Sequence, residues 1–369
     1  MESIRTTKKK LTDLHIIYSD QFLSRKSAGI SQDSVMTYNK LKDIAEVSKL
    51  SEIPLHASRK FFYGILRKIG LPFNFLYEKP GILWLEQFSS LSMKRRVTFI
   101  RTHDIFPITN PEWFRYLTTI KFYLAVTFQL RKDPVLIFNS EATRIEFEKF
   151  KKCNGVVLWC EPTKKNTSLC SYCDGCGFLK SRYHKKYAIS VGTIEPRKNY
   201  DLLLKITERA EKQNIPLHFV VVGRYGWKSQ KEQKDLKQRS NSNVTWLSNA
   251  CDTSVSMLIL NCAVFISTSI NEGFGLPAVE SRLQDCNLVL SDIPVYREIH
   301  GESNSVSLVS LSANPELWLE SVIHQSSREK SSSLAWRQVY RDKCKKQTNE
   351  LMTRLQATNS GELLGGANE

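Results

Sequence analysis

The sequence of 369 residues lacks long apolar runs. No stretch of about 18 apolar residues occurs, so no transmembrane helix is predicted. The apolar residues 14–18, which follow a polar N-terminus, are too few for the apolar core of a secretion signal. Nine cysteines are an odd number in a chain of this length, which does not fit a secreted disulfide scaffold. We therefore expect a cytoplasmic protein with reduced thiols.

Acidic residues are scarce relative to basic ones. The 37 Asp and Glu stand against 53 Lys and Arg, which gives a net charge of +16. Residues 1–185 carry 31 Lys and Arg against 17 Asp and Glu, a net charge of +14, and residues 186–369 carry the remaining +2. This one-sided charge indicates an anionic partner for the first half: a membrane surface, nucleic acid or an acidic substrate. The hydrophobic content of 41% excludes wholesale disorder.

Short apolar runs alternate with longer amphipathic ones, which is typical of parallel sheets with helices on both faces. The predicted strands are 14–18, 82–85, 97–101, 135–138, 156–159, 187–191, 217–222, 263–267 and 288–290. The predicted helices are 33–47, 112–130, 140–150, 200–212, 278–283 and 331–355. We expect an α/β protein made of residues 1–160, a Cys-rich hinge 161–185, a second domain 186–340, and a C-terminal helix with a frayed tail in 341–369.

The first informative segment follows the predicted strand 187–191. The strand ends at Gly192, and a helix begins near Asn199 with Arg197 and Lys198 just before it. Cations are unfavourable at a helix N-terminus, so an anionic ligand such as a diphosphate would remove the conflict. The alternative is a solvated basic pair on a loop.

The second segment, residues 267–280, follows the predicted strand 263–267. Gly273 and Gly275 form a tight turn that lets backbone amides approach a ligand, and Pro277 lies in the first turn of a helix. Glu272 and Glu280 are eight residues apart and could each accept a hydroxyl proton from a sugar or a ribose. Either glutamate alone would more often be a surface residue, but the combination is specific.

This segment resembles the E-x7-E motif of retaining nucleotide-sugar glycosyltransferases of family 4, the glycosyl transferases group 1, which have the GT-B fold. Residues 192–199 are similar to the family's phosphate-binding stretch, and 220–227 and 291–298 to its next two strand-to-loop elements. The resemblance covers 186–340 in the right order. One departure is Thr193, which stands where many relatives have Arg.

The first half carries a second part of the resemblance. Residues 102–107, with His103, and 110–114 resemble the family's His-Asp segment, in which the His faces the transferred sugar. Residues 139–143 are similar to the last strand and helix cap of the family's N-terminal domain. The stretch around Gly29 matches the usual loop after the first strand only weakly. A lone His after a strand would otherwise be structural.

The resemblance implies two Rossmann-like domains facing each other across a cleft that holds a nucleotide diphosphate sugar. It implies catalytic roles for His103 and Glu272, with Glu280 on the ribose and Gly29 as a loop contact. The groups implied to bind the donor phosphates are those of Arg197, Lys198, Gly273, Phe274, Gly275 and Leu276. Two fixed cations would stabilise the leaving diphosphate, so no cofactor or catalytic metal is expected.

The function implied is transfer of a hexose, of the mannose, glucose or rhamnose type, to a glycan or lipid-linked acceptor in envelope polysaccharide synthesis. The alternatives are a basic nucleic-acid-binding protein and a catalytically silent GT-B binding module; neither explains the two glutamates beside the intact cations. The basic, apolar stretches 59–68 and 116–132 favour peripheral binding to an anionic membrane, although a core face with a basic edge fits equally. We expect no nucleic-acid partner.

The cysteines suggest a metal site in the hinge. Cys170, Cys173 and Cys176 form C-x2-C-x2-C, with Cys160 upstream and His184 downstream. The four cysteines could hold structural zinc or an iron–sulfur cluster. A reduced loop with fortuitous cysteines is the alternative, because the usual two-knuckle spacing is missing.

Overall fold

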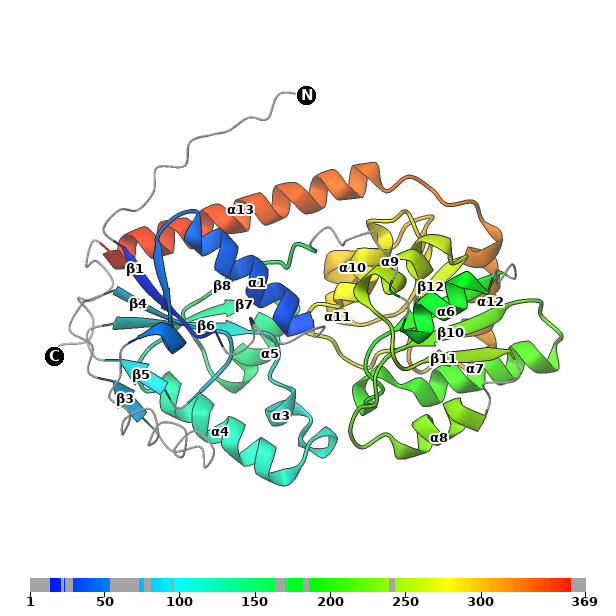
Figure 1. Cartoon of the computed structure of the whole chain (residues 1–369), viewed down its shortest axis with the longest axis horizontal. Coiled ribbons are helices and arrows are strands. Elements are labelled where there is room, and N and C mark those ends of the chain that lie inside the picture. Colours follow the sequence, from blue (N-terminus) through cyan, green and yellow to red (C-terminus); the bar gives the residue numbers. More distant parts are fainter. Residues whose placement is uncertain are drawn as a thin grey trace. The chain divides into compact units, whose positions relative to one another are not determined.

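The computed structural model (Figure 1) describes residues 14–20, 23, 29–53, 73–75, 81–89, 91–93, 96–162, 170, 172–181, 186–238 and 243–359. The chain divides into two compact units, one of Met1–Glu161 with Lys343–Glu369 and one of Pro162–Asp342. Three features of the sequence lie outside the described residues: the basic stretch 59–68, His184 and the expected frayed tail 360–369. Among the described helices, none has the length and apolar content that a bilayer crossing needs.

The first unit is built on a parallel sheet with the strand order β2-β1-β4-β6-β7-β8. Its strands are β1 (His15–Tyr18), β2 (Glu46–Lys49), β4 (Gly81–Leu85), β6 (Arg96–Thr102), β7 (Val135–Phe138) and β8 (Gly155–Val157). Its helices include α1 (Gly29–Lys42), α3 (Phe106–Thr109), α4 (Tyr116–Leu130) and α5 (Glu141–Phe150), with short 3-10 turns at Leu50–Glu52 and Pro111–Trp113. A small parallel pair joins β3 (Phe73–Phe75) to β5 (Leu91–Met93).

The second unit repeats this plan with the strand order β11-β10-β9-β12-β13-β14. Its strands are β9 (Tyr187–Val191), β10 (His218–Val222), β11 (Val244–Leu247), β12 (Val264–Ser267), β13 (Leu288–Ser291) and β14 (Val306–Val309). Its helices are α6 (Asp174–Lys180), α7 (Tyr200–Lys212), α8 (Gln230–Gln238), α9 (Asp252–Asn261), α10 (Leu276–Arg282), α11 (Pro294–Ile299) and α12 (Pro315–Ser327), with the 3-10 turn η3 (Pro196–Lys198).

Strand order in both sheets fixes where a ligand is expected. In the second unit β9 lies between β10 and β12. The chain proceeds outward from β9 through β10 to β11 on one side, and from β12 through β13 to β14 on the other, so the direction changes between β9 and β12. In the first unit the direction changes in the same way between β1 and β4. Ligands of open α/β sheets bind beyond the carboxyl ends of the strands at such a switch point. The segments that begin at Gly192 and Thr268 therefore lie where the sequence places the donor site.

The last helix, α13 (Leu334–Asn359), passes from the second unit into the first. Leu351 and Leu355 are buried in the core of the first unit, and Gln347 Oε1 accepts the backbone N–H of Trp159 at 2.9 Å. Residues 341–369 were expected to form a separate C-terminal element. Most of this stretch instead belongs to the first unit, because its apolar face completes that unit's core.

Two further expectations need correction. The helix predicted over 33–47 ends at Lys42, and Glu46–Lys49 forms an edge strand that pairs with β1. Within 161–185, where a hinge was expected, the described helix α6 belongs to the second unit and packs on α9. The packing is close enough that a Cβ on Gly175 would lie 2.5 Å from Ser254 Oγ.

Candidate functional site

The loop after β9 needs close backbone contacts. A Cβ on Gly223, at the end of β10, would lie 1.8 Å from the carbonyl oxygen of Gly192, so only glycine allows the two chain segments to approach this closely. Asn199 adopts a left-handed conformation (φ 52°) before α7, a conformation that Asn tolerates better than most residues. The backbone N–H of Ile270 donates to the carbonyl of Arg197 at 2.7 Å, which ties this loop to the one after β12.

The Glu272 carboxylate is the centre of the site. Its Oε1 accepts from Lys198 Nζ at 2.6 Å and from Ser269 Oγ at 2.8 Å, and its Oε2 pairs with Arg197 Nη1. The Glu272 side chain is 5% exposed. The structure thus brings together three of the predicted donor-site residues, from loops about 75 residues apart in sequence.

A second carboxylate balances the charge. Arg197 Nε lies 2.7 Å from Glu195 Oε1, and the Glu195 side chain is 4% exposed. The two cations Arg197 and Lys198 therefore face the two anions Glu195 and Glu272. Cations at a helix N-terminus are unfavourable, and here the two carboxylates of the protein compensate their charge. From the sequence we expected an anionic ligand to do so. Sequence reasoning assigned no role to Glu195 or Ser269, although both lie within the quoted segments.

The same contacts set the protonation of Glu272. Burial raises the pKa of a carboxyl, but Arg197, Lys198 and the Ser269 hydroxyl together outweigh burial and lower the pKa of Glu272 from 4.5 to about 2. Glu272 is therefore an anion throughout the physiological range and a poor proton donor.

The glycine turn leads into α10. Gly275 has a φ of 80°, and a Cβ there would lie 2.5 Å from Tyr296 Cε1. The Tyr296 hydroxyl is 2.8 Å from Ser267 Oγ, at the end of β12. The turn residues Gly273 and Phe274 lie between β12 and the Leu276 that begins α10, as predicted from the sequence. Glu280 is buried within α10.

In the first unit, His103 directly follows β6. Its Nδ1 lies 3.0 Å from Asn139 Nδ2, beyond β7, and 3.6 Å from Asp33 Oδ2 on α1. Its Nε2 lies 3.7 Å from Glu86 Oε2, beyond β4, and is buried without a hydrogen bond to any described residue. Polar groups from three neighbouring strand ends thus meet at His103. One sign of this is visible in the sequence, because Glu86 directly follows a buried apolar strand.

A buried ion pair supports this histidine. Arg101, in β6, donates to Asp33 through Nε at 2.9 Å and Nη2 at 3.1 Å. Burial opposes ionisation of Asp33, but Arg101 and then His103 lower its pKa below the usual range. Such a bidentate pair fixes both side chains.

Asp33, Glu86 and His103 lie close enough to share a metal ion. However, the carboxylates already accept protein donors. Glu86 accepts from Ser34 Oγ at 2.9 Å, from Trp84 Nε1 at 2.8 Å and from the Tyr18 hydroxyl, while Asp33 holds Arg101. The two carboxylates are therefore committed to hydrogen bonds and an ion pair rather than free to hold a metal ion.

Two other predicted residues lie elsewhere than expected. Gly29 is the first residue of α1 rather than part of a preceding loop. Cys160 belongs to the first unit, where Arg101 Nη2 lies 3.5 Å from its sulfur, whereas Cys170, Cys173 and Cys176 belong to the second. Cys160 is therefore not the fourth member of the cysteine group. Cys251, which sequence reasoning missed because it is 75 residues from Cys176, lies there instead.

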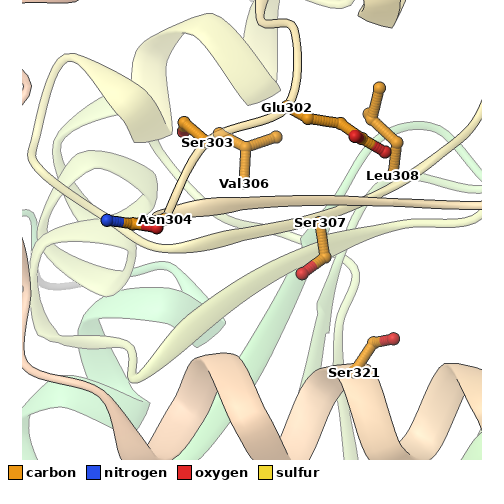
Figure 2. A pocket seen from close by; sticks show the side chains of 7 residues that line it. All are labelled: Glu302, Ser303, Asn304, Val306, Ser307, Leu308 and Ser321. Carbon is orange, nitrogen blue, oxygen red and sulfur yellow. The ribbon is translucent and has the colours of Figure 1, made fainter.

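A hollow of about 490 Å³ lies at the β14 edge of the second sheet (Figure 2). Its lining residues are Glu302, Ser303, Asn304, Val306, Ser307, Leu308 and Ser321. None of the predicted donor residues lines it, and its strand lies two positions from β12 in the sheet order. We assign it no part in the site.

Comparison with known proteins gives one matching family model. Residues 179–333 match the model of glycosyl transferases group 1. The serotype-specific mannosyltransferase WbdA of Escherichia coli is 28% identical over 154 residues, 40% of this chain and 19% of WbdA. The O-antigen chain mannosyltransferase RfbU of Salmonella typhimurium is 22% identical over 211 residues, 54% of this chain and 53% of RfbU. The match thus spans about a fifth to a half of these curated relatives.

Solved structures share the architecture of the chain. Anabaena HepE, solved with UDP-glucose, superposes with a TM-score of 0.64 at 16% identity, covering 92% of this chain and 100% of HepE. Sucrose-phosphate synthase from Thermosynechococcus elongatus superposes with a TM-score of 0.60 at 12% identity, covering 94% and 100%. This likeness confirms the predicted α/β fold of GT-B type.

The low pKa of Glu272 makes a prediction about stability. A carboxyl whose pKa is lower in the folded than in the unfolded state stabilises the protein above the unfolded value, and this contribution is lost as the pH falls towards the folded value. For Glu272 this stabilising contribution is therefore lost as the pH falls from 4.5 to about 2. At neutral pH we expect Glu272→Gln to lower the free energy of unfolding by roughly 3 kcal/mol.

The measurement is urea unfolding of both proteins at a series of pH values. The difference in unfolding free energy should narrow as the pH falls through this window. Glu320→Gln is the control, because Glu320 is an exposed carboxylate within α12 of the same unit. A wild-type advantage that stays constant down to the lowest pH would contradict the assignment.

Proposed function

Because residues 179–333 form a domain of the glycosyl transferases group 1 family, we propose that this chain is a retaining hexosyltransferase. It transfers a hexose from a nucleotide diphosphate sugar to a glycan or lipid-linked acceptor in envelope polysaccharide synthesis. The proposed hexose is mannose, since the curated relatives WbdA and RfbU are mannosyltransferases. The observation that carries the proposal is the clustering of Arg197 and Lys198 on Glu272 at the switch point of the second sheet.

This clustering suits a diphosphate. Arg197 and Lys198 are held in place before the donor arrives, so their electrostatic effect needs little reorganisation. A diphosphate carries more negative charge than one carboxylate and would take over both cations. Glu272 would then be released to accept hydroxyl protons from the sugar. Glu280, in the following helix, is proposed to hold the ribose, and the amides of residues 273–276 the phosphate oxygens.

Departure of the nucleoside diphosphate builds charge on its terminal phosphate. Two fixed cations can stabilise that charge, as a metal ion does in other transferases. Thr193 supplies no positive charge at the position where many relatives have Arg. The acceptor hydroxyl is proposed to attack on the leaving-group side and to give its proton to the departing phosphate. Because the acceptor hydroxyl itself attacks and the departing phosphate takes its proton, no carboxylate nucleophile of the glycosidase kind is needed.

His103 is proposed to contact the transferred sugar. Asn139 Nδ2 contacts Nδ1, whereas Nε2 makes no hydrogen bond to any described residue. A sugar hydroxyl would supply the hydrogen-bond partner that Nε2 lacks there. Asp33 and Asn139 act as positioning residues, since each lies beside Nδ1 and orients the ring.

The acceptor side is proposed to approach an anionic membrane through α4. Residues 1–185 carry a net charge of +14. One face of α4 exposes Tyr116, Leu117, Ile120, Tyr123 and Leu124, while Ala125 and Val126 face the core. Exposed apolar residues at helical spacing on a basic protein are typical of helices that lie in a membrane interface.

A donor panel tests the activity. Purified protein is incubated with GDP-mannose, UDP-glucose, UDP-galactose and dTDP-rhamnose, with and without a lipid-linked glycan acceptor, and nucleoside diphosphate release is measured. We expect the mannose donor to be consumed fastest and release to rise with acceptor. Turnover of another donor alone would overturn the assignment of mannose as the transferred sugar. Donor binding without any turnover would indicate a catalytically silent binding module.

Replacing Lys198 tests the site. Lys198→Ala removes one of the two cations, and we expect kcat/KM for the donor to fall by about two to three orders of magnitude. Lys205→Ala is the matched control, because Lys205 in α7 is exposed and, among the described residues, forms its ion pair with Asp201. Near-wild-type kinetics of Lys198→Ala, with the fold intact by circular dichroism, would refute the phosphate-binding role.

Vesicle flotation tests the membrane surface. We expect the protein to float with vesicles of phosphatidylglycerol and phosphatidylcholine, more weakly at high salt because charge is screened, and not with phosphatidylcholine alone. The double variant Leu117→Asp, Leu124→Asp should lose flotation. Leu317→Asp is the control, since Leu317 is 50% exposed on α12 of the second unit. Equal flotation of wild type and double variant would contradict this role of α4.

A further inference from the structure

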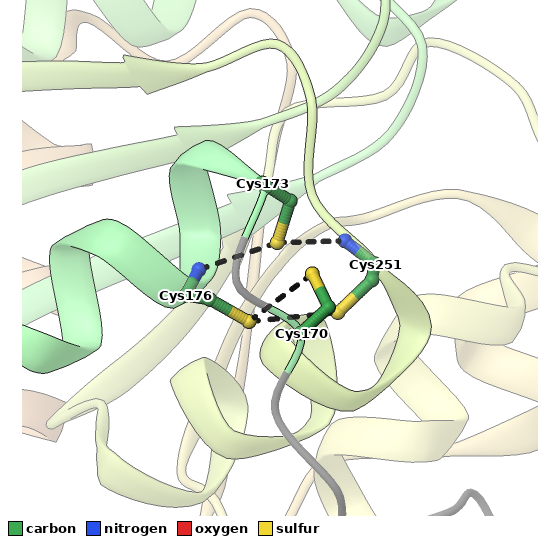
Figure 3. A group of neighbouring side chains, drawn as sticks. All are labelled: Cys170, Cys173, Cys176 and Cys251. Atoms are coloured by element: carbon green, nitrogen blue, oxygen red, sulfur yellow. Dashed lines mark hydrogen bonds between the residues drawn. The ribbon is translucent and has the colours of Figure 1, made fainter.

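We propose that Cys170, Cys173, Cys176 and Cys251 bind one structural zinc ion in the second unit. Figure 3 shows the four sulfurs turned towards one another, three from the segment that leads into and includes α6 and one from the start of α9. The proposal is independent of the transferase activity, because none of the predicted donor or catalytic residues belongs to this group.

The spacing of the sulfurs fits a single tetrahedral ion. Cys176 Sγ lies 3.7 Å from Cys170 Sγ and 3.7 Å from Cys251 Sγ, and all four sulfurs lie within 4.8 Å of one another. Zinc–sulfur bonds of about 2.3 Å at tetrahedral angles place neighbouring sulfurs about 3.8 Å apart. A disulfide would need about 2.05 Å, and all four cysteines are free thiols. An iron–sulfur cluster would hold its thiolates farther apart, on different iron atoms.

The surroundings of the sulfurs suit thiolates. The backbone N–H groups of Cys176 and Cys251 point at Cys173 Sγ from 3.3 and 3.4 Å (Figure 3). The backbone N–H of Ser254 points at Cys251 Sγ from 3.4 Å. Cys173 and Cys251 are thus the N-caps of α6 and α9. Such N–H donors spread the negative charge of the ligands and fix their orientation, which is the usual second shell of a metal site.

Burial makes the role structural. Cys173 is 9% exposed and Cys176 1%. Four protein sulfurs leave no open coordination position for water or substrate, and four-cysteine zinc sites are closed structural sites. The ion would connect two chain segments 75 residues apart and hold α6 against α9. Because α6 precedes β9 in the chain, this would fix the start of the unit whose next loop carries Arg197 and Lys198.

Metal analysis of the full chain tests the proposal. The protein is purified without chelators, and zinc and iron are counted by mass spectrometry of the elements. We expect one zinc per chain, and extended X-ray absorption at the zinc edge should show four sulfurs at about 2.3 Å. Cys251→Ser should lose most of the zinc and melt at a lower temperature. Cys153→Ser, which changes a half-buried cysteine of the first unit, should still contain one zinc per chain.

A variant that fails to fold leaves the wild-type measurements decisive. Titration of wild-type thiols with a mercurial should release one zinc to a metal-binding dye. Protein that contains no zinc, iron in place of zinc, or a disulfide within the group would overturn the proposal. A nitrogen ligand in the absorption spectrum would equally overturn the all-cysteine set.

Discussion

The site of the second unit depends on one interaction, the sharing of the Glu272 carboxylate between Arg197 and Lys198. Burying three charged groups costs solvation free energy, which their mutual attraction offsets only when the geometry is good. The geometry comes from backbone contacts that glycine permits, such as the approach of Gly223 to Gly192, and from the bond between Ile270 and Arg197. A local fold that holds two cations together in this way is prepared for an anion of higher charge.

The first unit uses the same place in its sheet with different chemistry. Its polar groups also lie beyond the ends of neighbouring parallel strands, but they are arranged around an imidazole and a buried carboxylate–guanidinium pair. The second unit offers two cations, each held by an ion pair with a buried carboxylate. The first offers a fixed ring, whose neighbours Asp33, Glu86 and Asn139 leave little freedom to rotate. The two units thus differ in what their strand ends can recognise.

Much of this could be predicted from the sequence, for physical reasons. Strands β7 and β9 and helix α7 begin and end where the apolar pattern places them, because each is a buried run bounded by turn residues. The predicted donor-binding residues stand out in the sequence because they lie in two short segments with unusual glycine and charge spacing. The roles of Asp33 and Cys251 could not be predicted, because each residue is distant in sequence from the residues that it contacts. Only the folded chain brings Asp33 to Arg101 and Cys251 to Cys176. The short edge strand β2 was missed because its side chains are half exposed and carry no periodic signal.

The path of α13 affects how this chain could be recombined with its relatives. The first unit is discontinuous in sequence: its core includes Leu351 and Leu355, and Arg354 donates to the side chain of Asn154 at 2.9 Å. A chimera that joins residues 1–161 to the second half of a relative would therefore separate the first unit from its own last helix. Exchange of the second unit between such chains needs two junctions, one on each side of residues 162–342, so that this unit moves as an insert.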